Sequence, residues 1–176
     1  MLVYGPPVEN GFYYDIALPD GVSISTDDFE RIETIMDEII KSDRPFTRCD
    51  LSTVEGLKRL ESEGSKYKLD NATRAIDGGA ESLSWYATGT TGEDWDDLCA
   101  GPHVPSTGRI GAAKMMSVAA SYWHGDANSD HLTRVYGTAF PDKKRLAAHL
   151  GQLEEARKRD HRVIGRKLGL FKIDEM

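Results

Sequence analysis

The sequence predicts an α+β fold, in which an antiparallel β-sheet is covered by helices on one face and is followed by a long C-terminal helix. Apolar residues alternate with period two in several short segments and recur at helical spacing in others. These strands and helices do not follow one another as βαβ units, which favours antiparallel pairing. A chain of 176 residues is long enough to bury a core without disulfides or a structural metal.

Four segments read as strands. Residues 11–18 place Phe12, Tyr14, Ile16 and Leu18 on one face, and a Pro-Asp-Gly turn follows at residues 19–21. The other predicted strands cover residues 83–87, 115–123 and 132–140, with a turn at Gly125–Asn128 between the last two. We also expect the short stretch Lys66–Leu69 to be extended.

Three segments read as helices. One covers about Thr26–Lys41, and a second begins with the capping-box sequence Ser52-Thr53-Val54-Glu55 and ends near Gly64. The third runs from Pro141 to about Gly169; at 1.5 Å per residue its ~28 residues would reach roughly 40 Å, further than a compact domain of this size. We therefore expect a compact domain over residues 1–140 and a helix over residues 141–176 that leads away from it.

Cysteine usage and the absence of targeting signals indicate the compartment. Cys49 and Cys99 lie in dissimilar surroundings, and we expect them to remain unpaired. The sequence carries neither a signal-peptide pattern nor an apolar stretch of membrane-spanning length, so we expect a reducing cytoplasm and no membrane partner.

Charge is distributed unevenly along the chain. The net charge is −7, but residues 1–100 carry 9 basic and 21 acidic side chains, whereas residues 101–176 carry 13 and 8. The basic residues of the predicted C-terminal helix therefore form either a solvated face or a surface for a phosphate backbone.

Cys99 and His103 are the strongest chemical signal. They are separated by Ala100-Gly101-Pro102, a turn sequence that allows the thiol and the imidazole to converge. The pair is compatible with half of a metal site, with a Cys nucleophile beside a base, or with acid–base chemistry on a bound water in which Asp97 fixes a polar group. It is equally compatible with a buried Cys and a satisfied His. Phosphate-loop, dinucleotide-binding and nucleophile-elbow patterns are absent, so the region around Cys99 carries most of the chemical signal.

Five segments together resemble the amino-terminal editing domain of bacterial threonyl-tRNA synthetase, which is related to the second additional domain of threonyl- and alanyl-tRNA synthetases. They are Tyr4–Asp15, Cys99–Pro105, Tyr122–Asp126, Arg134–Phe140 and Lys158–Gly165. The order and spacing of these segments match over nearly the whole chain. The resemblance implies a hydrolase that removes serine mischarged on threonine tRNA.

The same resemblance assigns roles to four residues. Cys99 and His103 would line the catalytic pocket, Asp97 would recognise the substrate amino group or hydroxyl, and Lys68 would interact with the substrate or the attacking water. Without the resemblance, Asp97 would read as an exposed loop acid and Lys68 as a solvated surface lysine. Editing in this form requires no cofactor.

The resemblance further implies a His-x-x-x-His helix upstream of Tyr4 and a class II catalytic core after the long helix, neither of which this sequence contains. We accordingly expect weak deacylation and weak zinc binding, with Cys99 and His103 as the two candidate zinc ligands in this sequence. The implied partners are the 3′ end of threonine tRNA and the catalytic and anticodon-binding domains of a synthetase. The alternative is a catalytically inert module that positions tRNA or serves a structural role.

Overall fold

The computed structural model, which describes residues 1–160 and 164–165, contains two antiparallel sheets and four α-helices. The larger sheet has the order β1-β3-β8-β7 with β2 paired to β3, and the smaller one has the order β4-β5-β6. The strands of the larger sheet are β1 (Leu2–Tyr4), β2 (Pro7–Val8), β3 (Gly11–Ile16), β7 (Ala112–Tyr122) and β8 (His131–Phe140). Those of the smaller sheet are β4 (Phe46–Ser52), β5 (Ser82–Thr88) and β6 (Asp96–Leu98). The predicted α+β class is confirmed, although the strands divide between two sheets.

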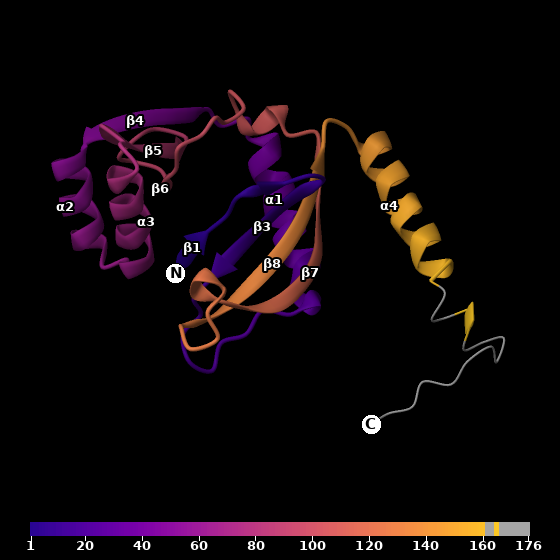
Figure 1. Cartoon of the computed structure of the whole chain (residues 1–176). Helices are drawn as coiled ribbons and strands as arrows, with labels where there is room; N and C mark the ends of the chain where they lie inside the picture. Colours follow the sequence, from indigo (N-terminus) through magenta and orange to yellow (C-terminus); the bar gives the residue numbers. More distant parts are fainter. Residues whose placement is uncertain (161–163, 166–176) are drawn as a thin grey trace.

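The helices are α1 (Phe29–Lys41), α2 (Thr53–Glu63), α3 (Lys66–Asp77) and α4 (Lys143–Lys158). In Figure 1, α2 and α3 lie side by side under the smaller sheet, α1 lies behind the larger sheet, and α4 projects away from both. None of the helices in the described residues is long and apolar enough to cross a membrane.

The larger sheet is held by long antiparallel pairing and by a buried ion pair. Tyr14 of β3 pairs with Val135 of β8, and Asp15 pairs with Arg134. Asp15 is only 4% exposed, and the Arg134 guanidinium donates to both of its oxygens at 2.7 and 2.8 Å. The same guanidinium lies over the ring of Tyr13. This bidentate contact neutralises the buried Asp15 carboxylate and also favours the observed register of β3 against β8.

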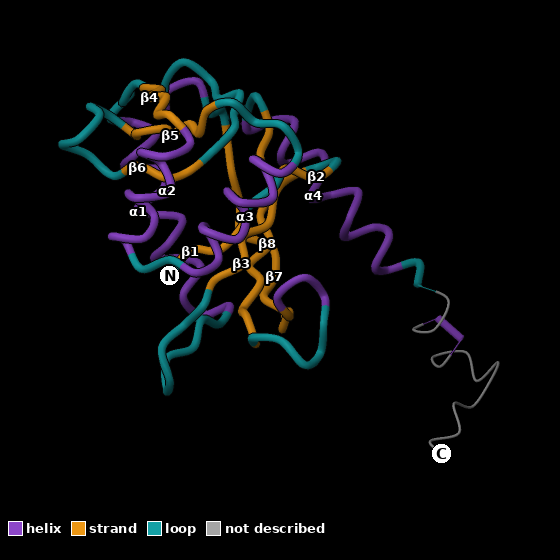
Figure 2. Tube along the Cα trace, turned by 60° about the vertical axis from the view of Figure 1, so that its left-hand side comes forward, coloured by secondary structure: helices purple, strands orange, loops and turns teal. Residues whose placement is uncertain are grey.

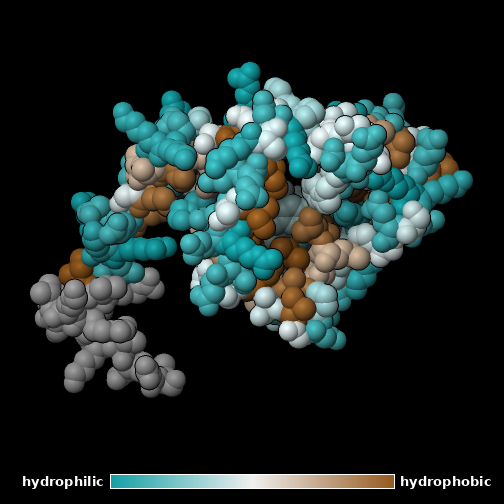
Figure 3. Space-filling model, turned by 180° about the vertical axis from the view of Figure 1, so that it is seen from behind, coloured by the Kyte–Doolittle hydropathy of each residue, from teal (hydrophilic) through white to brown (hydrophobic). Residues whose placement is uncertain are grey.

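On the opposite side of the molecule, apolar side chains gather in a band through the middle of the body (Figure 3). Helix α1, which lies behind the larger sheet in Figure 1, leaves the apolar side chains of Ile35 and Ile39 exposed. The helix is anchored by Glu33, whose carboxylate accepts hydrogen bonds from the Lys114 ammonium and from the backbone N–H of Met115 in β7.

The main apolar core lies between the smaller sheet and the pair α2–α3. Its buried members are Leu60, Ala72, Leu83 and Trp85. Leu60 is fully buried and Trp85 is 1% exposed. This core fixes the height of α3 above the sheet, and with it the position of the side chains at the start of α3.

Local signals decide where α2 begins and ends, as the sequence predicts. The Ser52 hydroxyl accepts from the backbone N–H of Glu55, and the Glu55 carboxylate accepts from the backbone N–H of Ser52, which is the predicted capping box. The helix ends at Gly64, whose positive φ of 67° is a conformation that glycine adopts without strain.

The prediction that Lys66–Leu69 is extended is wrong, because these residues form the first turn of α3. Ser65 caps this helix by accepting from the backbone N–H of Lys68. Leu69, Ala72 and Ile76 recur at helical spacing and pack into the core, a pattern that the polar residues between them obscure.

The predicted C-terminal helix is also shorter than expected. Helix α4 is continuous only over Lys143–Lys158, and Arg159 and Asp160 are not helical. Between Leu153 and Val163 the sequence offers no large apolar residue, so this part of the helix has nothing to bury. Figure 2 shows that the C-terminal part of helix α4 extends beyond the body of the protein. Residues 161–163 and 166–169 of the predicted helix lie outside the described residues.

The core between α2 and the smaller sheet predicts a large effect of truncating Leu60. Replacing this fully buried side chain (Leu60→Ala) should lower the free energy of unfolding by about 3 kcal/mol, through lost burial and a residual cavity. Val54→Ala on the same helix removes a side chain that is 62% exposed and should change it by less than about 0.5 kcal/mol. Urea unfolding followed by circular dichroism measures both, and equal effects would contradict the assignment of the core.

Candidate functional site

Cys99 and His103 converge as their spacing predicts. Cys99 follows β6 and is tied to β5 in both directions: its backbone N–H donates to the Ser84 carbonyl, and its carbonyl accepts from the Ser84 hydroxyl. The chain then turns through Gly101, and the Cys99 Sγ lies 3.2 Å from the His103 Nε2. Gly101 is required here because its φ is 72° and an added Cβ would lie 2.4 Å from the Tyr86 hydroxyl oxygen.

Two aromatic rings hold the imidazole of His103. The ring of Tyr86 lies 4.3 Å from the imidazole, centroid to centroid, and the ring of Phe46 lies 4.9 Å away in a stacked arrangement. The residue as a whole nevertheless remains exposed to solvent. Burial between the rings lowers the pKa of His103 below its ordinary value, because it penalises the charged form. At neutral pH the imidazole is therefore uncharged and able to accept a proton.

Asp97 is a buried acceptor, which contradicts its interpretation as an exposed loop acid. It lies on β6 opposite Tyr86, and the residue is 8% exposed. Its Oδ2 accepts from the Tyr14 hydroxyl at 2.9 Å, and its Oδ1 accepts from the backbone N–H of Leu98 at 2.8 Å. The Lys68 Nζ lies 2.5 Å from the same Oδ1. Extended pairing with β5 places this side chain on the face that the larger sheet approaches.

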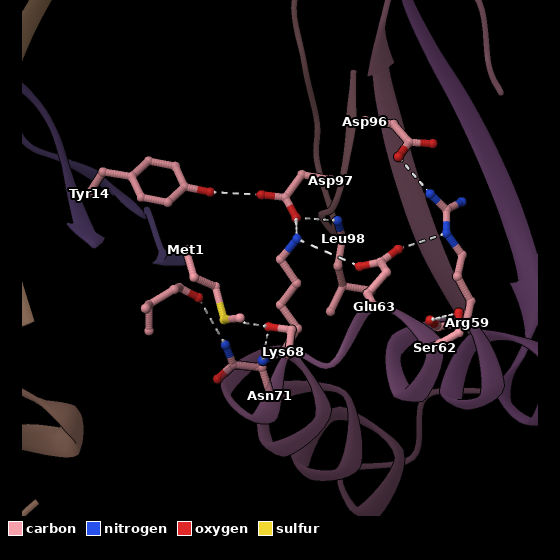
Figure 4. A network of polar contacts seen from close by, with 12 residues as sticks. Met1, Tyr14, Arg59, Ser62, Glu63, Lys68, Asn71, Asp96, Asp97 and Leu98 are labelled. Atoms are coloured by element: carbon pink, nitrogen blue, oxygen red, sulfur yellow. Dashed lines mark hydrogen bonds and ion pairs between the residues drawn. The ribbon is translucent and has the colours of Figure 1, made fainter. Parts of the chain in front are cut away.

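Lys68 is likewise not a solvated surface lysine. It stands in the first turn of α3 with its side chain 17% exposed, and the hydrogen bond from its backbone N–H to Ser65 fixes that turn. Its ammonium faces Asp97 and, at 3.9 Å, also the carboxylate of Glu63 (Figure 4). The structure thus brings Lys68 and Asp97 into direct contact, just as it brings Cys99 and His103 into contact.

Tyr14 joins the Lys68–Asp97 pair through its hydroxyl, which donates to Asp97, and the sequence does not single it out as a site residue. Burial raises the pKa of the Tyr14 hydroxyl, and the negative charge of Asp97, the hydrogen bond to Asp97 and the charge of Cys99 raise it further. One signal was available: the period-two pattern of β3 puts a hydroxyl-bearing ring among inward-facing apolar residues, where it needs a polar partner.

The arrangement combines an uncharged base with a charged carboxylate. His103 can accept a proton from water, whereas Asp97 and Lys68 offer one negative and one positive group to a substrate. Among residues 1–160 and 164–165, no group of three or more His, Cys, Asp or Glu side chains is placed to share a metal ion. Cys99 and His103 supply two donors, fewer than the three or four protein ligands of zinc sites.

Comparison with known proteins agrees with the resemblance that the sequence carries. Residues 86–136 match the family described as the threonyl and alanyl tRNA synthetase second additional domain. This segment includes Asp97, Cys99 and His103, whereas Lys68 and Tyr14 lie outside it.

The chain is also similar to threonine–tRNA ligases over nearly its whole length. It is 48% identical to the threonine–tRNA ligase of Anaeromyxobacter dehalogenans (strain 2CP-1) over 171 residues, which cover 97% of this chain and 25% of the relative. It is 51% identical to that of Rubrobacter xylanophilus over 170 residues, with the same coverage, and 45% identical to that of Natronomonas pharaonis over 176 residues, which cover 99% and 26%. The chain spans about a quarter of the length of the curated relatives it matches. The predicted resemblance to threonyl-tRNA synthetase is confirmed.

The lowered pKa of His103 predicts a titration and a stability effect. In the folded chain the His103 imidazole should titrate below its ordinary value of 6.5, as followed by two-dimensional ¹H–¹⁵N NMR of the ring nitrogens. Because the unfolded chain takes up this proton first, His103 should destabilise the fold as the pH falls from 6.5 through the folded-state value. The same measurement in denaturant supplies the control, and a folded-state midpoint at or above the denatured one would contradict the burial of the ring.

Proposed function

We propose, from the similarity to a quarter of threonine–tRNA ligase, that this chain is an editing module that hydrolyses the ester joining a mischarged serine to threonine tRNA. The proposal rests on two pairs of side chains, one at β6 and the other in the turn that follows this strand. The uncharged His103 contacts Cys99, and Lys68 contacts the buried Asp97. A general base can activate water, and a carboxylate can bind the charged amine of an aminoacyl ester, so the two pairs supply two of the groups that such a hydrolysis can use.

The need for a second site follows from the chemistry of the two amino acids. Threonine and serine both carry the hydroxyl and differ by one methyl group, whose burial supplies only about 1–3 kcal/mol of discrimination. A second, smaller site that accepts serine therefore improves the fidelity of a threonine–tRNA ligase. The contacts around Asp97 suit such a site because its carboxylate already accepts three hydrogen bonds or ion pairs of the kind that an ammonium and a hydroxyl make.

In the proposed reaction a water oxygen forms the new bond to the ester carbonyl carbon. The water proton passes to the His103 imidazole, the bond from the carbonyl carbon to the ribose oxygen breaks, and the proton returns to that oxygen. Asp97 binds the α-amino group or the hydroxyl of serine, and Lys68 interacts with the substrate or the attacking water. Cys99 lines the pocket, and its contact with the Nε2 orients the ring.

Helix α4 supports tRNA as the partner. It projects away from both sheets (Figure 1) and exposes basic side chains that include Lys143, Lys144 and Arg157. Such a helix is placed to lie near a phosphate backbone such as the acceptor arm. We further propose that residues 1–140 form the editing domain and that residues 141–176 lead toward the catalytic and anticodon-binding domains of a synthetase in the cytoplasm. Zinc enters this proposal only together with histidines from outside this sequence.

The proposal predicts hydrolysis that depends on His103. Threonine tRNA carrying ¹⁴C-serine should be deacylated faster than the same tRNA carrying threonine, and His103→Ala should lower kcat/KM by about 100-fold through loss of the general base. His131→Ala is the matched control. His131 is exposed, and its ring packs edge-on against that of Tyr122, away from the candidate site. Acid-precipitable ¹⁴C counts over time measure each rate.

The alternative function predicts a different result in the same assay. A chain that binds threonine tRNA with an affinity that falls steeply with salt, but leaves both esters intact, would be an inert tRNA-positioning module. That outcome would overturn the editing proposal.

A further inference from the structure

We propose that Glu63 is a positioning residue that receives Lys68 when the substrate amine takes its place at Asp97. This inference rests on the proposed function for the identity of the amine, and on the positions of five charged side chains for its geometry. In Figure 4 the five form a continuous series of contacts, which begins beside Tyr14 and runs through Asp97, Lys68, Glu63, Arg59 and Asp96.

The charge of this network leaves room for one more cation. It contains three carboxylates, those of Asp97, Glu63 and Asp96, and two cations, those of Lys68 and Arg59. The network alone therefore carries a net negative charge of one. An α-ammonium group brings the single positive charge that balances it, whereas the free carboxylate of a deacylated product adds to the imbalance.

The Lys68 ammonium is shared unequally between two carboxylates. It lies 2.5 Å from the Asp97 Oδ1 and 3.9 Å from the Glu63 Oε2. Since a charge-assisted hydrogen bond spans about 2.7–2.9 Å, a movement of about 1 Å would transfer the ammonium from Asp97 to Glu63. Lysine allows such a movement because its ammonium is a compact charge at the end of a flexible stem.

Glu63 is held ready for this exchange by groups outside the pocket. Its Oε1 accepts from the Arg59 Nε at 3.0 Å, which leaves Oε2 facing Lys68. Arg59 is fixed in turn by Asp96 at 2.6 Å and by the ring of the buried Trp85, 4.8 Å from its guanidinium carbon. Glu63 therefore remains in place while Lys68 moves.

A glutamate at position 63 does little to stabilise helix α2. It is the last residue of α2, where the helix dipole disfavours a carboxylate. Its i,i+4 pair with Arg59 has the cation on the N-terminal side, which is the weaker of the two orders. The contacts that account for this glutamate are those with Lys68 and Arg59.

The exchange removes a conflict at Asp97. The Lys68 ammonium and the substrate ammonium compete for this carboxylate. A largely buried lysine that is displaced without a new partner raises the free energy of the complex, because its charge is left unpaired. With Glu63 present, the ammonium pairs with Asp97 and Lys68 pairs with Glu63, so each cation faces a carboxylate throughout. Displaced toward Glu63, Lys68 also vacates the face of Asp97 on which the amino acid binds.

The test compares two hydrolysis-resistant ligands by calorimetry. One is serine joined by an amide to 3′-amino-3′-deoxyadenosine, and the other is its N-acetyl derivative, which lacks the ammonium. Glu63→Gln should weaken binding of the amine ligand about tenfold, the size of one charge-assisted hydrogen bond, and weaken the acetylated ligand by less than about twofold. Glu63→Asp keeps the charge and should recover part of the lost affinity. Glu61→Gln, an exposed glutamate on the same helix, is the matched control.

Three outcomes would overturn the proposal: equal losses for both ligands, which indicate a merely structural role; unchanged affinity in Glu63→Gln; and no binding of the amine ligand to the unmodified chain. Serine-ester hydrolysis by the same preparations separates this inference from the proposed function. An amine-specific loss without hydrolysis supports the role of Glu63 and refutes editing. Hydrolysis with identical affinities in the unmodified chain and Glu63→Gln supports editing and refutes the role of Glu63.

Discussion

The buried carboxylate of Asp97 is the interaction on which the arrangement of this protein depends. It accepts from Tyr14 of the larger sheet, from the backbone of β6 in the smaller sheet, and from Lys68 at the start of α3. A buried carboxylate that loses a charged partner without a replacement costs about 3–5 kcal/mol, so Lys68 can leave Asp97 only when another cation takes its place. One side chain thereby ties two sheets and a helix into one site. The binding of a ligand at Asp97 must work with these partners, which is why the second carboxylate beside Lys68 has functional consequences.

The sequence predicts those features that short-range chemistry determines. The turn from Cys99 to His103 and the capping box of α2 each lie within five residues, and the strand pattern of β3 needs only period two. The contact between Tyr14 and Asp97 joins residues 83 positions apart, and no local pattern indicates it. The environment of Lys68 cannot be inferred from the sequence for a related reason. Its helix has a narrow apolar stripe among polar residues, and only the packing of α3 on α2 and the smaller sheet turns this lysine toward Asp97.

The uneven charge of the chain acquires a meaning in the folded structure. The acidic first half supplies all three carboxylates of the network, Glu63 on α2 and Asp96 and Asp97 on β6. Helix α4, from the basic half, projects away from these carboxylates (Figure 1). Negative charge is thus concentrated where an ammonium would bind and positive charge where a phosphate backbone would lie. An aminoacylated tRNA end carries both kinds of charge, and the chain separates the surfaces that would receive them.

Burial acts in opposite directions on the ionisable groups of the site, and both effects favour the same pH range. It lowers the pKa of His103, which keeps the imidazole available as a base at neutral pH. It raises the pKa of Tyr14, which keeps the phenol protonated, so that the hydroxyl continues to donate to Asp97 instead of repelling it. An uncharged donor can stand beside the carboxylate of Asp97, and an uncharged base beside the thiol of Cys99, without adding charge to the site. The charge of the network is therefore left to its lysine, arginine and three carboxylates, and it is this fixed negative excess that an incoming ammonium would neutralise.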